Sequence, residues 1–96
     1  MAQLIKANGE TATVAPKNGH SFTLDELQEL VGGYIENVYL DDGLIMVVNE
    51  EGKFSGLPLN KKATDLADAV ILPWDEIVGD AVVGTSEEMG GEDDED

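Results

Sequence analysis

The sequence contains no cysteine and no arginine among its 96 residues, and its only histidine is His20. Without cysteine there is no disulfide framework, no thiolate metal site and no cysteine nucleophile, an absence that suits a reducing cytoplasm. A lone histidine cannot form a histidine-based metal site unless carboxylates supply the other ligands. We therefore interpret His20 as an ordinary loop residue and expect neither a metal nor a cofactor.

Long apolar runs are also missing. No segment approaches the ~20 consecutive apolar residues that a membrane helix needs. The first residues lack the apolar run that follows a positive patch in a signal peptide. We expect a protein of the cytoplasm that neither spans nor binds a membrane.

Positive charge is scarce. The chain has 21 acidic residues against five lysines, which gives a formal charge of −16. Seven of the acids lie in residues 85–96, and the other fourteen leave −9 on residues 1–84 after the five lysines are counted. Nucleic acid and anionic membranes are therefore disfavoured as direct partners, because both need a basic footprint. A protein with a basic surface is the favoured partner, with an association rate that falls as salt rises.

What the sequence does contain is enough apolar material for one small core, at 42% of the residues. The length fits a single domain, which we place at residues 1–84. Residues 85–96 have one apolar side chain and seven acids, so we expect a disordered acidic tail there.

The stretch FTLDELQELVGG predicts an amphipathic helix from Thr23. Thr23 and Glu26 have the spacing of a capping box, and Phe22 and Leu27 have that of a hydrophobic staple. Gly32 or Gly33 should end the helix. The apolar face is predicted to contain Leu24, Leu27, Leu30 and Val31.

The remaining pattern predicts mainly antiparallel strands. Residues 2–7 and 10–14 should form a hairpin around Asn8-Gly9, and residues 34–40 and 44–51 a second hairpin around Asp42-Gly43. The arm LIMVV is apolar on both faces, which is typical of a strand covered on both sides. The last strand is expected in DAVVG, residues 80–84.

A weaker helical pattern occupies residues 60–70, with Asn60 or Thr64 as its cap and a stripe of Ala63, Leu66, Ala67 and Val70. Residues 74–79 predict one helical turn after Pro73, and Trp74 is assigned to the core. We predict an α+β fold: a small, mostly antiparallel sheet with one well-defined amphipathic helix packed on it and a short second helix.

No group of residues has the spacing of a catalytic site. Asp41 and Asp42 are explained by turn chemistry, and Asp65 and Asp68 by a solvated helix face. The glycines at 32 and 33 follow a helix, whereas a phosphate cradle needs glycines before one. We expect a protein that is not an enzyme, with no catalytic residue.

The most distinctive polar segment is NEEGKFSGLPLN, residues 49–60, which follows the apolar strand directly. Polar groups of defined chemistry beside such a strand indicate either a binding loop or a structural connection, and both interpretations stay open. The candidate binding residues are Asn49, Glu50, Glu51, Lys53, Gly56, Leu57, Pro58 and Asn60, with Tyr34 and Glu36 at the border.

The string VGGYIENVYLDDGLIMVVNEEGKFSGLPLN, followed by IVGDAVVG, resembles a family of small proteins classed as a domain of unknown function. The resemblance covers roughly residues 22–84, and the loop carries its most specific part. It implies an accessory protein of bacteriophages and related mobile elements, acting in the host cytoplasm. It brings no catalytic residue with it.

Two functions are consistent with these observations. The first is a non-enzymatic interaction protein that binds a basic partner through its acidic surface, as an inhibitor or a nucleic-acid mimic. The alternative is a regulatory or sponge module that binds a small ligand at residues 49–60, where Lys53 is the nearby positive charge. A homodimer through a sheet edge or through the second hairpin is left open.

Overall fold

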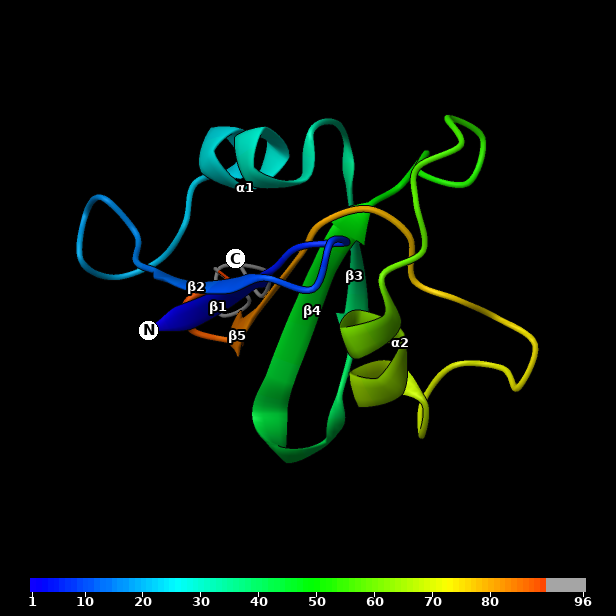
Figure 1. Ribbon diagram of the computed structural model, residues 1–96. Helices are drawn as coiled ribbons and strands as arrows, with labels where there is room; N and C mark the ends of the chain where they lie inside the picture. The colour runs from blue at the N-terminus through cyan, green and yellow to red at the C-terminus, as the bar shows by residue number, and fades with distance from the viewer. Residues whose placement is uncertain (90–96) are drawn as a thin grey trace.

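The computed structural model describes residues 1–89 and confirms the α+β class (Figure 1). Its core is a five-stranded antiparallel sheet accompanied by two helices. In chain order the elements are β1 (Ala2–Ile5), β2 (Thr11–Val14), α1 (Leu24–Val31), β3 (Ile35–Tyr39), a 3-10 turn (Asp41–Gly43), β4 (Leu44–Asn49), α2 (Lys61–Ala67) and β5 (Ala81–Thr85).

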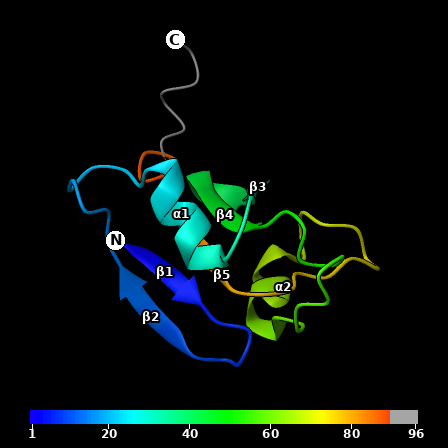
Figure 2. The ribbon, with the colours of Figure 1, turned by 90° about the horizontal axis from the view of Figure 1, so that it is seen from above.

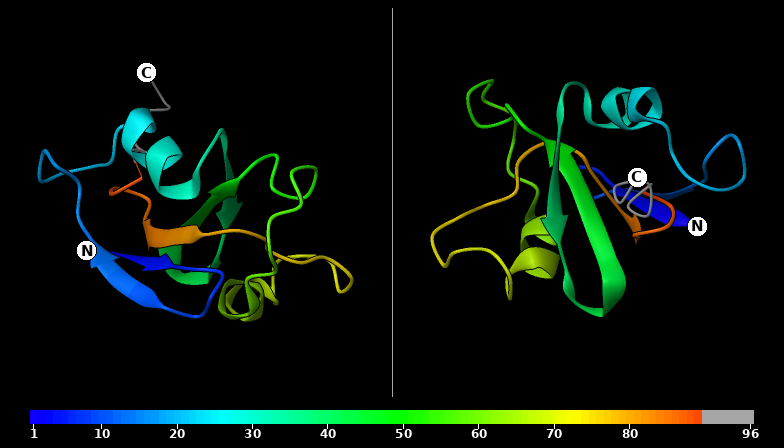
Figure 3. Two further views of the ribbon diagram at one scale, coloured as in Figure 1. Left: turned by 45° about the horizontal axis from the view of Figure 1, so that its top comes forward. Right: turned by 180° about the vertical axis from the view of Figure 1, so that it is seen from behind.

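The strands lie in the order β2-β1-β5-β4-β3, so the last strand of the chain occupies the centre of the sheet. The two expected hairpins, β1–β2 and β3–β4, form its two halves. Strand β5 pairs with β1 through Leu4 and Val82 and with β4 through Val47 and Val82. All three predicted sheet segments are therefore confirmed, and β5 joins the two hairpins (Figure 3, left).

The core has two layers, one on each face of the sheet. Successive side chains of a strand point to opposite faces, and β4 uses both: Ile45 and Val47 face the α1 layer, while Met46 and Val48 face the α2 layer. The expectation that this strand is covered on both sides is confirmed (Figure 3). Strand β4 contains no glycine and is rich in β-branched residues, a composition that is typical of a buried strand in the interior of a sheet.

Helix α1 begins with the predicted capping box. The Thr23 hydroxyl accepts from the Glu26 N–H at 3.2 Å, and the Glu26 carboxylate accepts from the Thr23 N–H at 2.7 Å. The bond from the Thr23 N–H to the carboxylate, with that from the Lys17 N–H, lowers the pKa of Glu26. The helix ends at Gly32, in the left-handed conformation. Of the predicted apolar face, Leu27 and Val31 are buried, whereas Leu24 is exposed because it lies at the first turn, beyond the sheet.

The second hairpin turns on Asp42 and Gly43, both at positive φ, 65° and 75°. A type I′ pair needs this conformation at both central residues. Asp42 is the only non-glycine residue with positive φ among residues 1–89, and aspartate tolerates that region better than most side chains.

The segment before β5 departs from the sequence-based predictions. Residues 74–79 form no helical turn, and the Trp74 side chain is 77% exposed rather than in the core. Leu66 and Val70, predicted on the inner face of the second helix, are exposed too. Helix α2 ends at Ala67, and its buried residues, Ala63 and Ala67, belong to the α2 layer. The buried side of this short helix consists of two alanines, and its larger apolar side chain, Leu66, lies outside.

The first residues of the predicted disordered tail are instead part of the fold. Thr85 belongs to β5, and Met89 is buried in the α1 layer. Between them, the Glu88 carboxylate accepts from the Thr85 N–H, and the Phe22 N–H donates to the Glu88 carbonyl at 2.7 Å. The remainder of the predicted tail, residues 90–96, lies outside the described residues.

The capping box yields a stability prediction. Thr23→Ala removes the hydroxyl that accepts from the Glu26 N–H, and we expect it to lower the free energy of unfolding by about 1 kcal/mol. Thr23→Ser keeps the hydroxyl oxygen, and its free energy of unfolding should lie within about 0.5 kcal/mol of that of the unmodified chain. Urea unfolding followed by circular dichroism measures both. Equal losses in the two variants would contradict a role for the hydroxyl.

Candidate functional site

Two asparagines anchor the loop at residues 49–60. Asn49 lies at the end of β4, where its side-chain amide donates to the Val31 carbonyl at 3.2 Å and its oxygen accepts from the Glu51 N–H at 2.8 Å. These bonds tie the start of the loop to the end of α1. The main chain is fixed as well, because the Glu50 N–H donates to the Tyr34 carbonyl at 2.8 Å.

Asn60 ends the loop and is almost fully buried, at 1% exposure. Its amide donates to the Ile5 and Gly79 carbonyls, both at 2.8 Å. Its oxygen accepts from the Ala63 N–H at 3.1 Å and so caps α2. One side chain therefore joins β1, the start of α2 and the segment before β5. Asn60 is a structural residue, and its amide has no hydrogen left for a ligand.

The middle of the loop packs closely against the chain that leads into β5. A Cβ added to Gly52 would lie 2.9 Å from a Val78 methyl, and one added to Gly79 would lie 2.7 Å from a Leu57 methyl. The Pro58 carbonyl accepts from the Gly79 N–H at 2.8 Å. These contacts support the structural interpretation for Leu57 and Pro58.

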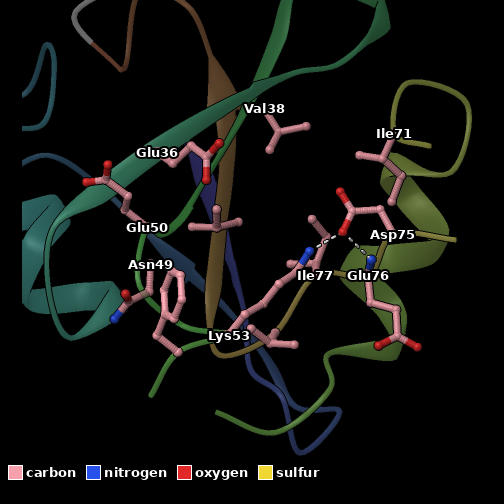
Figure 4. A pocket seen from close by; sticks show the side chains of 12 residues that line it. Glu36, Val38, Asn49, Glu50, Lys53, Ile71, Asp75, Glu76 and Ile77 are labelled. Carbon is pink, nitrogen blue, oxygen red and sulfur yellow. Dashed lines mark hydrogen bonds and ion pairs between the residues drawn. The ribbon is translucent and has the colours of Figure 1, made fainter. Parts of the chain in front are cut away.

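The other part of the loop borders a pocket of about 210 Å³ on the α2 face of the sheet (Figure 4). One wall comes from β3, β4 and the start of the loop, and the other from residues 71–78. The lining residues are Glu36, Val38, Val48, Asn49, Glu50, Lys53, Phe54, Ile71, Asp75, Glu76, Ile77 and Val78.

The pleat of the β3–β4 hairpin explains the strand wall. Glu36 lies opposite Val48, and Val38 lies opposite Met46, so these residues share one face. That face belongs to the α2 layer, where Val48 and Ile77 are buried. Because β3 is an edge strand, its side chains there reach the rim of the layer. The lining of the pocket therefore combines the buried Val48 and Ile77 with the exposed Glu36.

Four carboxylates and one ammonium line this pocket. Glu36 and Glu50 stand on the strand side and Asp75 and Glu76 on the other, while Lys53 extends from the loop to form an ion pair with Asp75 (Figure 4). Asp75 also accepts from the Glu76 N–H at 2.8 Å. The Lys53 ammonium, followed by that N–H, holds the pKa of Asp75 below its ordinary value. The residues lining the pocket carry a formal charge of −3 at neutral pH.

The structure divides the predicted site residues into groups. Asn49, Glu50, Lys53 and the border residue Glu36 line the pocket together. Leu57 and Pro58 instead border a separate hollow of about 270 Å³ beside the end of α1. The other candidates, Glu51, Gly56, Asn60 and Tyr34, line neither of the two hollows.

Sequence reasoning missed the second wall of the pocket. Ile71, Asp75 and Glu76 lie 11 to 16 positions beyond the end of the loop at Asn60, and a helical turn was predicted around the two acids. The two acids that follow Trp74 were the available signal in the sequence. The contact between Asp75 and Lys53 depends on the path of the chain from α2 to β5, and no local sequence pattern predicts that path.

Features of other site classes are absent from residues 1–89. No group of three or more histidine, cysteine, aspartate or glutamate side chains is placed to hold a metal ion there. Within the same residues, no helix is long and apolar enough to cross a membrane. His20 is exposed in the loop before α1, and its N–H donates to the Asn18 side chain at 2.8 Å.

A family model described as a domain of unknown function, DUF3846, matches residues 2–95. The chain belongs to this family. The DUF3846 match reaches beyond the residues 22–84 that carry the resemblance, and so includes the N-terminal hairpin. No curated protein and no solved structure matches the chain.

The buried amide of Asn60 can be tested by substitution. Asn60→Ala leaves the Ile5 and Gly79 carbonyls without their donor and removes the α2 cap, and we expect a loss of about 3 kcal/mol or more in unfolding free energy. Asn60→Asp keeps the capping oxygen and the side-chain size but loses the donor, so it should also destabilise strongly. The exposed Asn18→Ala is the matched control, with a loss of about 1 kcal/mol or less. A stable Asn60→Asp protein in urea unfolding would show that the donor is dispensable.

The ion pair across the pocket predicts a pH effect. A titration of the Asp75 carboxyl by NMR should give a midpoint below the ordinary value of 3.8. Because the folded-state pKa is lowered, the stability that the pair contributes is present above the unfolded-state pKa and is lost as pH falls through the folded one. Lys53→Met should raise the Asp75 midpoint. Lys61→Met, which removes the separate pair with Asp65, should leave it unchanged; a shift in both variants would indicate a general charge effect.

Proposed function

We propose that this protein is a non-enzymatic interaction module that binds a partner protein through an acidic surface centred on the pocket. The observation that carries the proposal is the charge of that face: four carboxylates surround one lysine, on a chain with a formal charge of −16. A field of this sign attracts basic surfaces and repels phosphates. An inhibitor or mimic of nucleic acid that occupies the basic surface of its target fits this chemistry.

Exposed aromatic side chains beside the acids support a protein partner. Phe54, at the mouth of the pocket, is 96% exposed, and Trp74 precedes Asp75 in the opposite wall. Both segments, the loop after β4 and the chain before β5, project on the same side of the molecule (Figures 1 and 2). Tryptophan and other aromatic residues are enriched at protein interfaces, where they supply most of the apolar contact.

The alternative, a small-ligand module, is less well supported by the same pocket. Its volume of about 210 Å³ is below the range of about 300 to 1,000 Å³ that is usual for drug-sized ligands. Its negative charge opposes phosphates and carboxylates, which most metabolites carry. Lys53, the residue that would attract an anion, already pairs with Asp75.

The cellular setting of the proposal comes from the resemblance of the sequence. Together with the acidic surface, it supports an accessory role for a bacteriophage or related mobile element, with a host protein as the target in the cytoplasm. An accessory protein of this kind would act by occupying a surface and would need no catalytic residue.

Capture from a bacterial lysate tests the proposal. We expect a partner to be retained at about 0.1 M ionic strength and released at about 1 M, where the Debye length falls from about 10 Å to about 3 Å. The triple variant Glu36→Gln, Glu50→Gln, Glu76→Gln should weaken binding of that partner about tenfold, or by about 1.4 kcal/mol.

The control variant Glu10→Gln, Asp25→Asn, Glu29→Gln removes the same charge from exposed positions outside this pocket. It should retain the partner nearly as well as the unmodified chain. Equal weakening by the two triple variants would show that net charge, and not the pocket face, is responsible. Retention that is independent of salt would contradict the electrostatic proposal itself.

A further inference from the structure

We propose that the pocket between β3–β4 and residues 71–78 receives a single basic side chain, a lysine or an arginine, from the partner protein. The inference rests on the proposed function and specifies what the acidic face recognises. It draws on the size of the pocket, on the arrangement of its polar and apolar walls, and on the position of Lys53.

The size of the pocket suits one side chain. A volume of about 210 Å³ is smaller than the usual site of a drug-sized ligand. One wall includes Glu36 and Val38 of the edge strand β3, so a residue carried on another protein can enter beside this strand without any rearrangement of the sheet.

The walls match the two parts of a basic side chain. Lysine and arginine carry an apolar stem below a charged head, and the stem packs on apolar surface while the head stays near water or an acid. Val38, Val48 and Ile77 provide apolar surface inside the pocket. Glu36 and Asp75 stand on opposite sides of it, so an inserted cation meets a carboxylate from either wall (Figure 4). Carboxylates on two sides favour a guanidinium, which donates in several directions in its plane.

The chain itself already places a lysine in this environment. Lys53 crosses the pocket to Asp75, which shows that an ammonium group at the end of an aliphatic stem fits there. Both side chains of this pair are partly exposed, at 62% and 34%. Exposed pairs contribute little free energy, so an incoming cation can displace the Lys53 ammonium at small cost. Lys53 then acts as an internal competitor for the site.

A peptide titration tests the inference directly. The probe is acetyl-Gly-Arg-Gly-amide, added to the isotope-labelled full chain and followed by NMR, and its lysine analogue is titrated in parallel. The neutral isostere is the same peptide with citrulline in place of arginine. We expect amide shifts concentrated at residues 36–38, 48–54 and 71–78 with the basic peptides, and at least about tenfold weaker binding with citrulline.

Two lysine variants separate competition from net charge. Lys53→Met removes the internal competitor and should tighten arginine-peptide binding about two- to fivefold, the range expected for loss of an exposed ion pair. Lys61→Met changes the net charge equally and also removes a lysine–aspartate pair, but at α2 outside the pocket, and should not tighten binding. Glu36→Gln should weaken binding of the peptide.

Several results would overturn the inference. Citrulline binding as well as arginine would do so, as would shifts spread over the acidic surface or equal effects of the two lysine variants. If lysate capture depends on the pocket acids while no basic peptide binds, the proposed function stands and the inference of an inserted side chain falls. If the peptides bind as expected but no protein is captured, the preference of the pocket for a basic group stands and the proposed function falls.

Discussion

The buried amide of Asn60 is the interaction on which the arrangement of the second half of the chain depends. It satisfies carbonyls on β1 and on the segment before β5 while capping α2. A buried carbonyl that loses its hydrogen-bond donor costs about 1 to 3 kcal/mol. The positions of the three segments relative to one another are therefore stabilised jointly by this one side chain. This junction sets the path on which residues 71–78 return to the sheet, and hence the far wall of the acidic pocket.

The elements that could be predicted are those whose causes are local. The capping box of Thr23 and Glu26 needs only a spacing of three residues, and Asp42-Gly43 needs only a turn pair. The two-sided strand followed from its unbroken run of apolar residues, LIMVV, because a strand with a solvated face alternates instead. In the candidate site, local patterns predicted the loop and the neighbouring residue Glu36. Both contribute to one wall of the pocket.

The second wall could not be predicted because it is made by contacts between distant segments. Lys53 and Asp75 meet across 22 positions, and residues 71–78 have neither helical nor strand periodicity. The core position predicted for Trp74 was wrong for a related reason. The α2 layer is filled by Met46, Val48 and Ile77 together with the alanines at 63 and 67, and the indole lies outside it.

The central place of β5 has a consequence for the order of folding. The sheet consists of two local hairpins with β5 between them. The hairpins are therefore joined into one sheet only when Ala81–Thr85 is inserted. The β1–β5 pairs join residues separated by most of the domain, and such contacts form slowly because a long loop must close first. During synthesis, the inner edges of β1 and β4 therefore stay unpaired until residue 85 has left the ribosome. In that interval the nascent chain presents two open strand edges, and the net negative charge of the chain opposes their pairing with neighbouring copies.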